Sequence, residues 1–284
     1  MVLRKEEVVG TIVLASMILG LIAPIVAYSV AKPAEVSEAM FQFPFTGKLK
    51  YVTSKTYSVS EEFEVVLDVG GGGAEILESE KENEVKVEIY EYPAFFPFFR
   101  KPAVKEYNIE FTDNVLHVTI SGYVAKVYVP PKFVKRVSSV ISSGGLSVKI
   151  DAGNVETCDL KATGGGVELD LSNLGNSTIS INISGGGFSG KLSYSDYVGE
   201  AKIIIYISGG GGRMDIENMD AKVKVDAAIS GGGGTVEVND VTVLSLGGAS
   251  VTKTYVDEGF DEATKKLLLN IDVSGGGFQI GIRK

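Results

Sequence analysis

Short runs of glycine recur through the second half of this sequence and restrict its fold more than any other feature. They begin at Gly144, Gly164, Gly185, Gly209, Gly231, Gly247 and Gly275. Successive runs start 16 to 28 residues apart, and five of the seven follow a serine. Such a recurrence is typical of repeat proteins in which each repeat forms one supersecondary unit. The chain is therefore predicted to be a stack of repeats.

Apolar and polar residues alternate on both sides of the glycine runs. Ile179, Ile181 and Ile183 alternate with polar residues before Gly185, and the same pattern follows Gly166. A period of two points successive side chains to opposite faces, as in half-buried strands. Glycine has no Cβ, so it suits sharp corners between such strands. We predict an all-β fold: a single-stack, β-helix-like β-solenoid with glycine-rich corners and about 22 residues per coil, behind one N-terminal transmembrane helix.

One glycine run resembles a nucleotide-binding loop. Residues 185–192 fall one residue short of the phosphate-loop pattern, because Leu192 replaces the Ser or Thr that would hold magnesium. The polar residues after Leu192 indicate a turn rather than the start of a helix. A structural corner is therefore the prediction, and no cofactor is expected.

The N-terminal segment is predicted to contact a membrane. Residues 8–31 carry no charge and are long enough to cross a bilayer. Arg4 and Lys5 precede them, which favours a cytoplasmic N-terminus. The alternative is a cleaved signal peptide, since residues 29–31 resemble a cleavage site. In both cases the remainder is expected outside the cytoplasm, and an uncleaved anchor would place the protein at the cell membrane as a single-pass protein.

The organisation predicted from the sequence has four parts. Residues 1–35 form the anchor or signal peptide, and residues 36–60 form a tether and lead-in. Residues 61–136 form an N-terminal section of the β-solenoid, and residues 137–284 form the glycine-rich repeat stack. Within the second section, residues 92–102 form a loop that contains Phe95, Phe96, Phe98 and Phe99. This loop either caps one end of the stack or contacts lipid or a partner protein.

Composition limits the chemistry available to the chain. The excess of 36 acidic over 27 basic residues disfavours a nucleic-acid partner. A single cysteine, Cys158, permits no intrachain disulfide and is expected to be a packed core residue. The only histidine, His117, alternates with apolar residues in a strand. One Cys and one His exclude the usual zinc sites. No catalytic residue, cofactor or metal site is predicted.

Acidic residues that follow the glycine runs suggest one alternative. Glu168, Asp170, Asp215, Glu217 and Glu237 are all expected to face outward. If the coils stack in register, they would form an acidic strip. Such a strip could bind calcium or act on a glycosidic bond, although outward acids are ordinarily a solvated face. A polysaccharide-acting enzyme is therefore the least favoured function.

Two glycosylation sequons lie close together, at Asn176 and Asn182. Asn182 alternates with inward-facing isoleucines, so it is expected to be accessible. Both asparagines are possible glycosylation sites, and they give weak support to an external location.

From about residue 50 to the end, the chain resembles the putative-adhesin family, Gly-rich β-solenoid domains of unknown function that often follow a membrane anchor. The resemblance is carried by the strand from Phe63 to Gly73, the passage Val127-Tyr128-Val129-Pro130, and the Ser-Gly repeats that begin at Ser143. The chain departs from the family in having Gly-Gly-Gly where a polar residue commonly follows one glycine. The resemblance implies a surface or envelope role and no catalytic residues.

The favoured function is therefore that of a membrane-anchored, cell-surface, adhesin-like structural or binding protein without catalytic activity. Its expected partners are the bilayer, through residues 8–31, and a surface protein, a glycan or further copies of the chain, because open strand edges can pair with another chain. The alternative is an envelope signalling or stress-response accessory that acts through its transmembrane span.

Overall fold

The structure is a computed structural model, and it describes residues 49–91, 105–195, 199–217, 220–248 and 250–284. All of these belong to one compact unit, Phe45–Lys284. The predicted anchor and the aromatic loop with Phe95, Phe96, Phe98 and Phe99 lie outside the described residues. Within the described part, no helix is long and apolar enough to cross a membrane.

The described residues form an all-β protein, as predicted. Nineteen strands join into one sheet, and one 3-10 turn, η1 (Pro131–Phe133), follows the fifth strand. β1, within the predicted lead-in, is the first strand. The strands are β1 (Lys50–Ser58), β2 (Phe63–Glu78), β3 (Glu84–Glu91), β4 (Glu106–Thr112), β5 (Val115–Val129), β6 (Val134–Ile141), β7 (Gly145–Asp151), β8 (Thr157–Ala162), β9 (Gly166–Leu174), β10 (Thr178–Ile183), β11 (Gly187–Tyr194), β12 (Gly199–Ile207), β13 (Gly211–Glu217), β14 (Lys222–Ile229), β15 (Gly233–Val238), β16 (Val241–Gly247), β17 (Val251–Val256), β18 (Lys265–Val273) and β19 (Gly277–Ile282).

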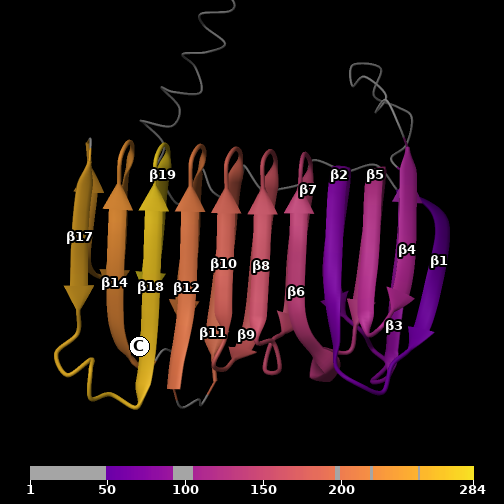
Figure 1. The fold of residues 1–284 in the computed structure, drawn as a ribbon, viewed down its shortest axis with the longest axis horizontal. Coiled ribbons are helices and arrows are strands. Elements are labelled where there is room, and N and C mark those ends of the chain that lie inside the picture. The colour runs from indigo at the N-terminus through magenta and orange to yellow at the C-terminus, as the bar shows by residue number, and fades with distance from the viewer. Residues whose placement is uncertain (1–48, 92–104, 196–198, 218–219, 249) are drawn as a thin grey trace, which may run out of the picture. The chain divides into compact units, whose positions relative to one another are not determined.

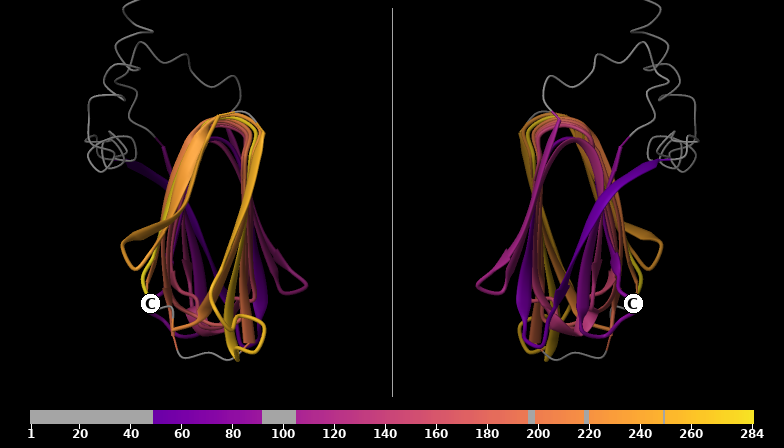
Figure 2. Two further views of the ribbon diagram at one scale, coloured as in Figure 1. Left: turned by 90° about the vertical axis from the view of Figure 1, so that its left-hand side faces the viewer. Right: turned by 90° about the vertical axis from the view of Figure 1, so that its right-hand side faces the viewer.

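The sheet folds over at the glycines into two layers, which meet in a narrow arch (Figure 2). Layer A runs β4-β5-β2-β6-β8-β10-β12-β18-β14-β17. Layer B runs β1-β3-β5-β2-β7-β9-β11-β13-β19-β15-β16. The long strands β2 and β5 give their first half to layer A and their second half to layer B. Neighbours from β5 and β2 through to β14 and β15 are parallel, and the strands beyond them at both ends are joined in antiparallel pairs (Figure 1).

One hydrophobic core lies between the layers. The inward side chains of successive strands align in rows, such as Ile181, Ile205 and Ile271, all of which are nearly inaccessible to solvent. Cys158 occupies a parallel row and is 1% exposed. The predicted alternation of inward apolar and outward polar residues is confirmed, and so is the packing role of Cys158.

The glycine corners stack directly on one another. Gly165, Gly186 and Gly210 have φ between +87 and +99. A Cβ on any of the three would lie 1.7–1.8 Å from the carbonyl oxygen of the corner glycine in the preceding coil. No side chain fits so close to a backbone atom, and L-residues rarely adopt this backbone conformation. Contact between coils therefore requires glycine at these three corner positions.

The coils do not stack in the order of the sequence. The last coil, β18 and β19, lies between β12–β13 and β14–β15, and the pair β16–β17 closes the end of the stack (Figure 1). This arrangement explains the uneven spacing of the last glycine runs. The run at Gly247 connects β16 and β17, which pair antiparallel with β15 and β14 at the end of the stack. The run at Gly275 belongs to an interior coil.

The alternation of phenylalanine and glycine in one inward row explains why the last coil is inserted. In one inward row of layer B, Phe188, Gly212, Phe278 and Gly234 follow one another on neighbouring strands. A Cβ on Gly212 would lie 2.0 Å from the Phe188 ring, and one on Gly234 would lie 2.3 Å from the Phe278 ring. Each ring therefore covers a neighbouring glycine. If β13 packed directly against β15, two glycines would adjoin and leave a gap, which close packing disfavours.

The inward row in layer A is interrupted by a serine. Ser139 lies between Leu67 and Leu160, is 3% exposed, and its hydroxyl has no hydrogen-bond partner among the described residues. Because burial of an unsatisfied hydroxyl is unfavourable, Ser139→Ala is expected to raise the free energy of unfolding by about 1 kcal/mol. Thermal unfolding followed by circular dichroism measures this. Ser138→Ala, on the outward side of the same strand, should change little, and a lower melting temperature for Ser139→Ala would contradict the prediction.

Candidate binding surface

The outward side chains of layer B form two long rows, which we call the polar face. Each row takes one residue from each strand, because neighbouring strands pair in register. The first row is Ser54, Glu88, Lys126, Glu75, Ser147, Glu168, Ser189, Arg213, Gln279 and Thr235. The second is Thr56, Lys86, Tyr128, Leu77, Lys149, Asp170, Lys191, Asp215, Gly281 and Glu237. The repeat thus places one polar or charged group on most strands at a regular spacing of about 4.8 Å.

The predicted acidic strip is not formed. In the second row, Lys149 and Lys191 alternate with Asp170 and Asp215, so opposite charges are neighbours across the sheet. The other three acids lie apart from this alternation and from one another. Glu168 is flanked by two serines in the first row, Glu217 lies outside both rows, and Glu237 lies beyond Gly281. Opposite charges at paired positions stabilise a sheet, whereas like charges would repel. The expectation of a continuous carboxylate strip for calcium or glycoside chemistry is therefore wrong.

Ion pairs link the charges of the polar face from strand to strand. Lys149 contacts Glu168 at 3.0 Å, and Lys191 contacts Glu217 at 3.1 Å. The hydrogen bond to Glu217 and the charge of that carboxylate raise the pKa of the Lys191 ammonium. All four side chains are substantially exposed, so each pair contributes little to stability. Their main effect is to hold the outward side chains in a regular arrangement.

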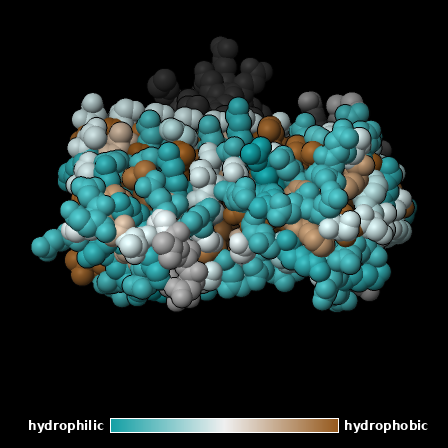
Figure 3. Space-filling view, turned by 60° about the horizontal axis from the view of Figure 1, so that its bottom comes forward, coloured by the Kyte–Doolittle hydropathy of each residue, from teal (hydrophilic) through white to brown (hydrophobic). Residues whose placement is uncertain are grey.

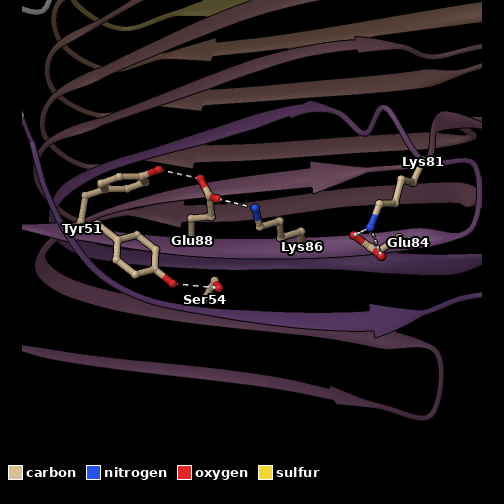
Figure 4. Close-up of polar contacts among 7 residues, drawn as sticks. Tyr51, Ser54, Lys81, Glu84, Lys86 and Glu88 are labelled. Atoms are coloured by element: carbon tan, nitrogen blue, oxygen red, sulfur yellow. Dashed lines mark hydrogen bonds and ion pairs between the residues drawn. The ribbon is translucent and has the colours of Figure 1, made fainter.

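Glu88 organises the opposite end of the polar face (Figure 4). Its carboxylate accepts a hydrogen bond from the Tyr90 hydroxyl at 2.6 Å and pairs with the Lys86 ammonium at 2.6 Å. Partial burial acts to raise the pKa of Glu88, but the hydrogen bonds from Lys86 and Tyr90 outweigh it and leave the pKa low. The same hydrogen bond, together with burial, raises the pKa of Tyr90. On the neighbouring strand, the Tyr51 hydroxyl donates to Ser54 at 2.9 Å.

A cavity of about 50 Å³ interrupts the polar face near its other end. Gly281 forms its floor, at a row position where the flanking strands carry Asp215 and Glu237. Because Gly281 has no side chain, the Asp215 carboxylate extends toward it, and its Oδ1 atom lies 3.1 Å from the position that a Cβ on Gly281 would take. Its lining residues are Arg213, Asp215, Glu237, Asp240, Gln279, Gly281, Ile282 and Arg283.

The lining of this cavity combines hydrogen-bond donors and acceptors. Arg213 holds Asp215 through hydrogen bonds of 3.1 and 3.3 Å. Arg283 lies between two acids, 3.7 Å from Glu217 and 3.8 Å from Asp240. Guanidinium groups donate, carboxylates accept, and an amide such as that of Gln279 does both. This mixture suits a ligand that carries several hydroxyl groups.

The other residues considered from the sequence are distributed over the unit. His117 is exposed on β5 and faces outward, opposite Glu110 and Val66. Burial raises the pKa of the Cys158 thiol to about 12, so this thiol is unreactive. In the part of the chain that the structure describes, no group of three or more His, Cys, Asp and Glu side chains is placed to hold a metal ion.

Both sequon asparagines are exposed. Asn182 faces outward on β10, and Asn176 lies in the turn before that strand. They are accessible to modification, and their glycosylation stays a prediction. The phenylalanines at 95, 96, 98 and 99 lie outside the described residues, so their contact role also stays a prediction. The surface seen from the edge opposite the glycine corners is mainly hydrophilic, with separate apolar spots (Figure 3).

A scan against family models and a search of curated proteins found no match to this sequence. Solved structures gave matches. A putative cell adhesion protein from Clostridium sporogenes is 16% identical, with 83% of this chain and 100% of the other covered and a TM-score of 0.43. A putative adhesin from Bacteroides fragilis is 12% identical, with 83% and 98% covered and a TM-score of 0.28. A putative lipid binding protein from Parabacteroides distasonis is 12% identical, with 84% and 98% covered and a TM-score of 0.24.

Proposed function

We propose that this protein is a membrane-anchored, adhesin-like binding protein without catalytic activity, whose β-solenoid domain lies outside the cytoplasm and binds surface glycans. The cavity at Gly281, set in a flat and regularly spaced polar face, is the observation that carries the proposal. The uncharged residues 8–31 support the anchor. The stacked corners and parallel pairing support the β-solenoid form.

A glycan fits this surface for two reasons. Sugar hydroxyls can donate to Glu237 and accept from Arg283 or Gln279, which lie around one small cavity. A polysaccharide also repeats along its length, as the polar face does from strand to strand. A polymer could therefore place one hydroxyl group in the cavity and contact the neighbouring rows with its other units. Many weak contacts of this kind add to a useful affinity.

Filling the cavity tests this proposal. Gly281 does not have a positive φ, and a Cβ there would lie 3.1 Å from the Asp215 Oδ1 atom, which can move. Gly281→Leu should therefore fold normally and reduce glycan binding at least tenfold. Binding of the full chain to an array of polysaccharides measures the effect. Ser180→Leu, on the outward side of layer A, adds the same side chain elsewhere and should bind like the wild type.

The outcomes are distinct. Equal binding by Gly281→Leu and the wild type would remove the cavity from the proposal. The absence of binding to every glycan by the wild-type chain would remove glycans as the ligand class. Circular dichroism of both variants verifies that they are folded before binding is compared.

A separate experiment tests whether the β-solenoid domain lies outside the cytoplasm. Protease treatment of intact cells should digest the repeat region and leave the anchor, with loss of the 30.1 kDa chain. Digestion only after lysis would place the domain inside the cell and contradict the proposal. The alternative role in envelope signalling depends on residues 1–31, which lie outside the described residues, and it stays a prediction.

A further inference from the structure

The tripeptide Lys-Thr-Tyr occurs twice in the sequence, at residues 55–57 and 253–255. The first copy lies in β1 and the second in β17. These strands are the outermost strands at opposite ends of the stack, β1 in layer B and β17 in layer A (Figure 1). Nearly two hundred residues separate the copies in sequence, yet both are at the positions where the core would otherwise be open.

At one end, Lys55 bridges the two layers. It pairs with Val87, which is fully buried, so its side chain starts on the inward side of β1. Its ammonium donates a hydrogen bond of 2.8 Å to the carbonyl oxygen of Ile109, on the edge strand β4 of layer A. The lysine therefore crosses the open end of the stack from layer B to layer A.

At the other end, Lys253 makes the equivalent bridge in the opposite direction. It pairs with the buried Ala227 and starts on the inward side of β17. Its ammonium donates a hydrogen bond of 2.8 Å to the carbonyl oxygen of Ser245, on the edge strand β16 of layer B. The same side chain, the same distance and the same type of acceptor occur at both ends.

The two tyrosines face inward beside the lysines. Tyr57 stacks on Phe111 with ring centroids 5.4 Å apart, and Tyr255 donates a hydrogen bond of 2.7 Å to Asp257. Both rings pack against the hydrophobic core. Burial, reinforced by the charge of Glu110, raises the pKa of Tyr57, and the hydrogen bond to Asp257 raises that of Tyr255. The tyrosines therefore cover the core as neutral rings.

The position of each lysine within its inward row shows what it would meet in a neighbouring copy. In layer A, the row that begins at Ile109 ends at Lys253. In layer B, the row that begins at Lys55 ends at Leu244. Head-to-tail stacking of two copies would place Lys253 against Ile109 and Lys55 against Leu244. Each contact would bury an ammonium beside an apolar side chain at the end of a largely apolar row, which is strongly unfavourable.

We propose that the two Lys-Thr-Tyr segments are end caps that prevent copies of this chain from joining end to end. Inward-pointing charges on edge strands are a known means of blocking strand pairing. Both edges of the described unit carry such a charge, whereas the strands between them continue the same parallel pairing from coil to coil. The lysines thus limit a repeat that could otherwise extend through further copies.

The test removes the two charges and keeps the side-chain length. Lys55→Met with Lys253→Met, in the full chain in one non-ionic detergent, is expected to form linear assemblies whose size increases with protein concentration. Sedimentation velocity and negative-stain electron microscopy measure this. Each single variant keeps one lysine, whose ammonium every head-to-tail contact would still bury, and is expected to remain in the wild-type state. Lys55→Arg with Lys253→Arg retains both charges and should remain in the wild-type state.

The matched control adds the same side chains to the same strands. Thr56→Met with Thr252→Met places them on the outward sides of β1 and β17, and this variant should not assemble. Assembly of this control to the same extent as the lysine variant would overturn the proposal, as would end-to-end polymers of the wild type. A folded lysine double variant, verified by circular dichroism, that keeps the wild-type sedimentation would also overturn it. If the methionine variant does not fold, assembly of Lys55→Gln with Lys253→Gln decides between the same outcomes.

Discussion

Gly186→Ala is expected to prevent the stack from folding. Gly186 has a φ of +93, and a Cβ on this residue would lie 1.7 Å from the carbonyl oxygen of Gly165. Both contacting groups belong to the backbone of hydrogen-bonded coils, so neither can move away without separating strands on two layers. The expected loss is about 5 kcal/mol or more, which is comparable with the whole stability of many domains.

Gly248→Ala separates the free-energy cost of the contact between coils from the cost of placing an alanine at positive φ. Gly248 has a φ of +102 at the corner between β16 and β17, and no atom of the described residues beyond its chain neighbours lies within 4 Å of the position that its Cβ would take. This variant should lose only the cost of an alanine at positive φ, about 1–2 kcal/mol. Chemical denaturation followed by circular dichroism compares the two. Similar losses in both variants would show that the corner conformation, rather than contact between coils, requires glycine.

Deletion of residues 264–284 is expected to unfold the C-terminal half of the stack. The deletion removes β18 and β19, which separate β12 from β14 and β13 from β15. It also removes seven inward apolar side chains, namely Leu267, Leu269, Ile271, Val273, Phe278, Ile280 and Ile282. Burial of such side chains contributes about 1.5–3 kcal/mol each, so the total loss exceeds about 10 kcal/mol.

Limited proteolysis and thermal unfolding measure the effect of this deletion. Rapid cleavage after residue 199, with an N-terminal fragment that resists protease, is the expected pattern. A chain that stops after Ile282 loses only the contacts of Arg283 and Lys284, including the ion pair of Lys284 with Asp257, and should remain folded. Unchanged cooperative unfolding of the longer deletion would show that β14 and β15 can pack on β12 and β13 without the last coil.

The strands, the core and the corners could be predicted from the sequence because they depend on local patterns. Alternation such as that of Ile179, Ile181 and Ile183 shows directly which side chains are buried. The order of the coils could not be predicted in this way. Residues 184–188 and 274–278 have the same sequence, Ser-Gly-Gly-Gly-Phe, and each fits beside any similar coil. Only the pairing of Phe278 with Gly212 and Gly234 distinguishes its position.

Part of the polar face could have been predicted from the sequence. Lys149, Asp170, Lys191, Asp215 and Gly281 each lie five residues after a glycine with positive φ. Counting from the corners would have placed them in one row and shown that the charges alternate. The cavity at Gly281 was missed because a glycine five residues after a corner looks like any other glycine. Its importance depends on the carboxylates that the neighbouring strands place beside it.

The insertion of the last coil affects how the protein is made. The ribosome makes β18 and β19 after β14 to β17, yet these later strands lie in the interior of the stack. The segment from β14 to β17 therefore has no complete surface to pack against while the chain is still being synthesised or exported. Folding of this half must wait until β18 and β19 have emerged, and a chain that stalls before them would remain open to proteases and chaperones.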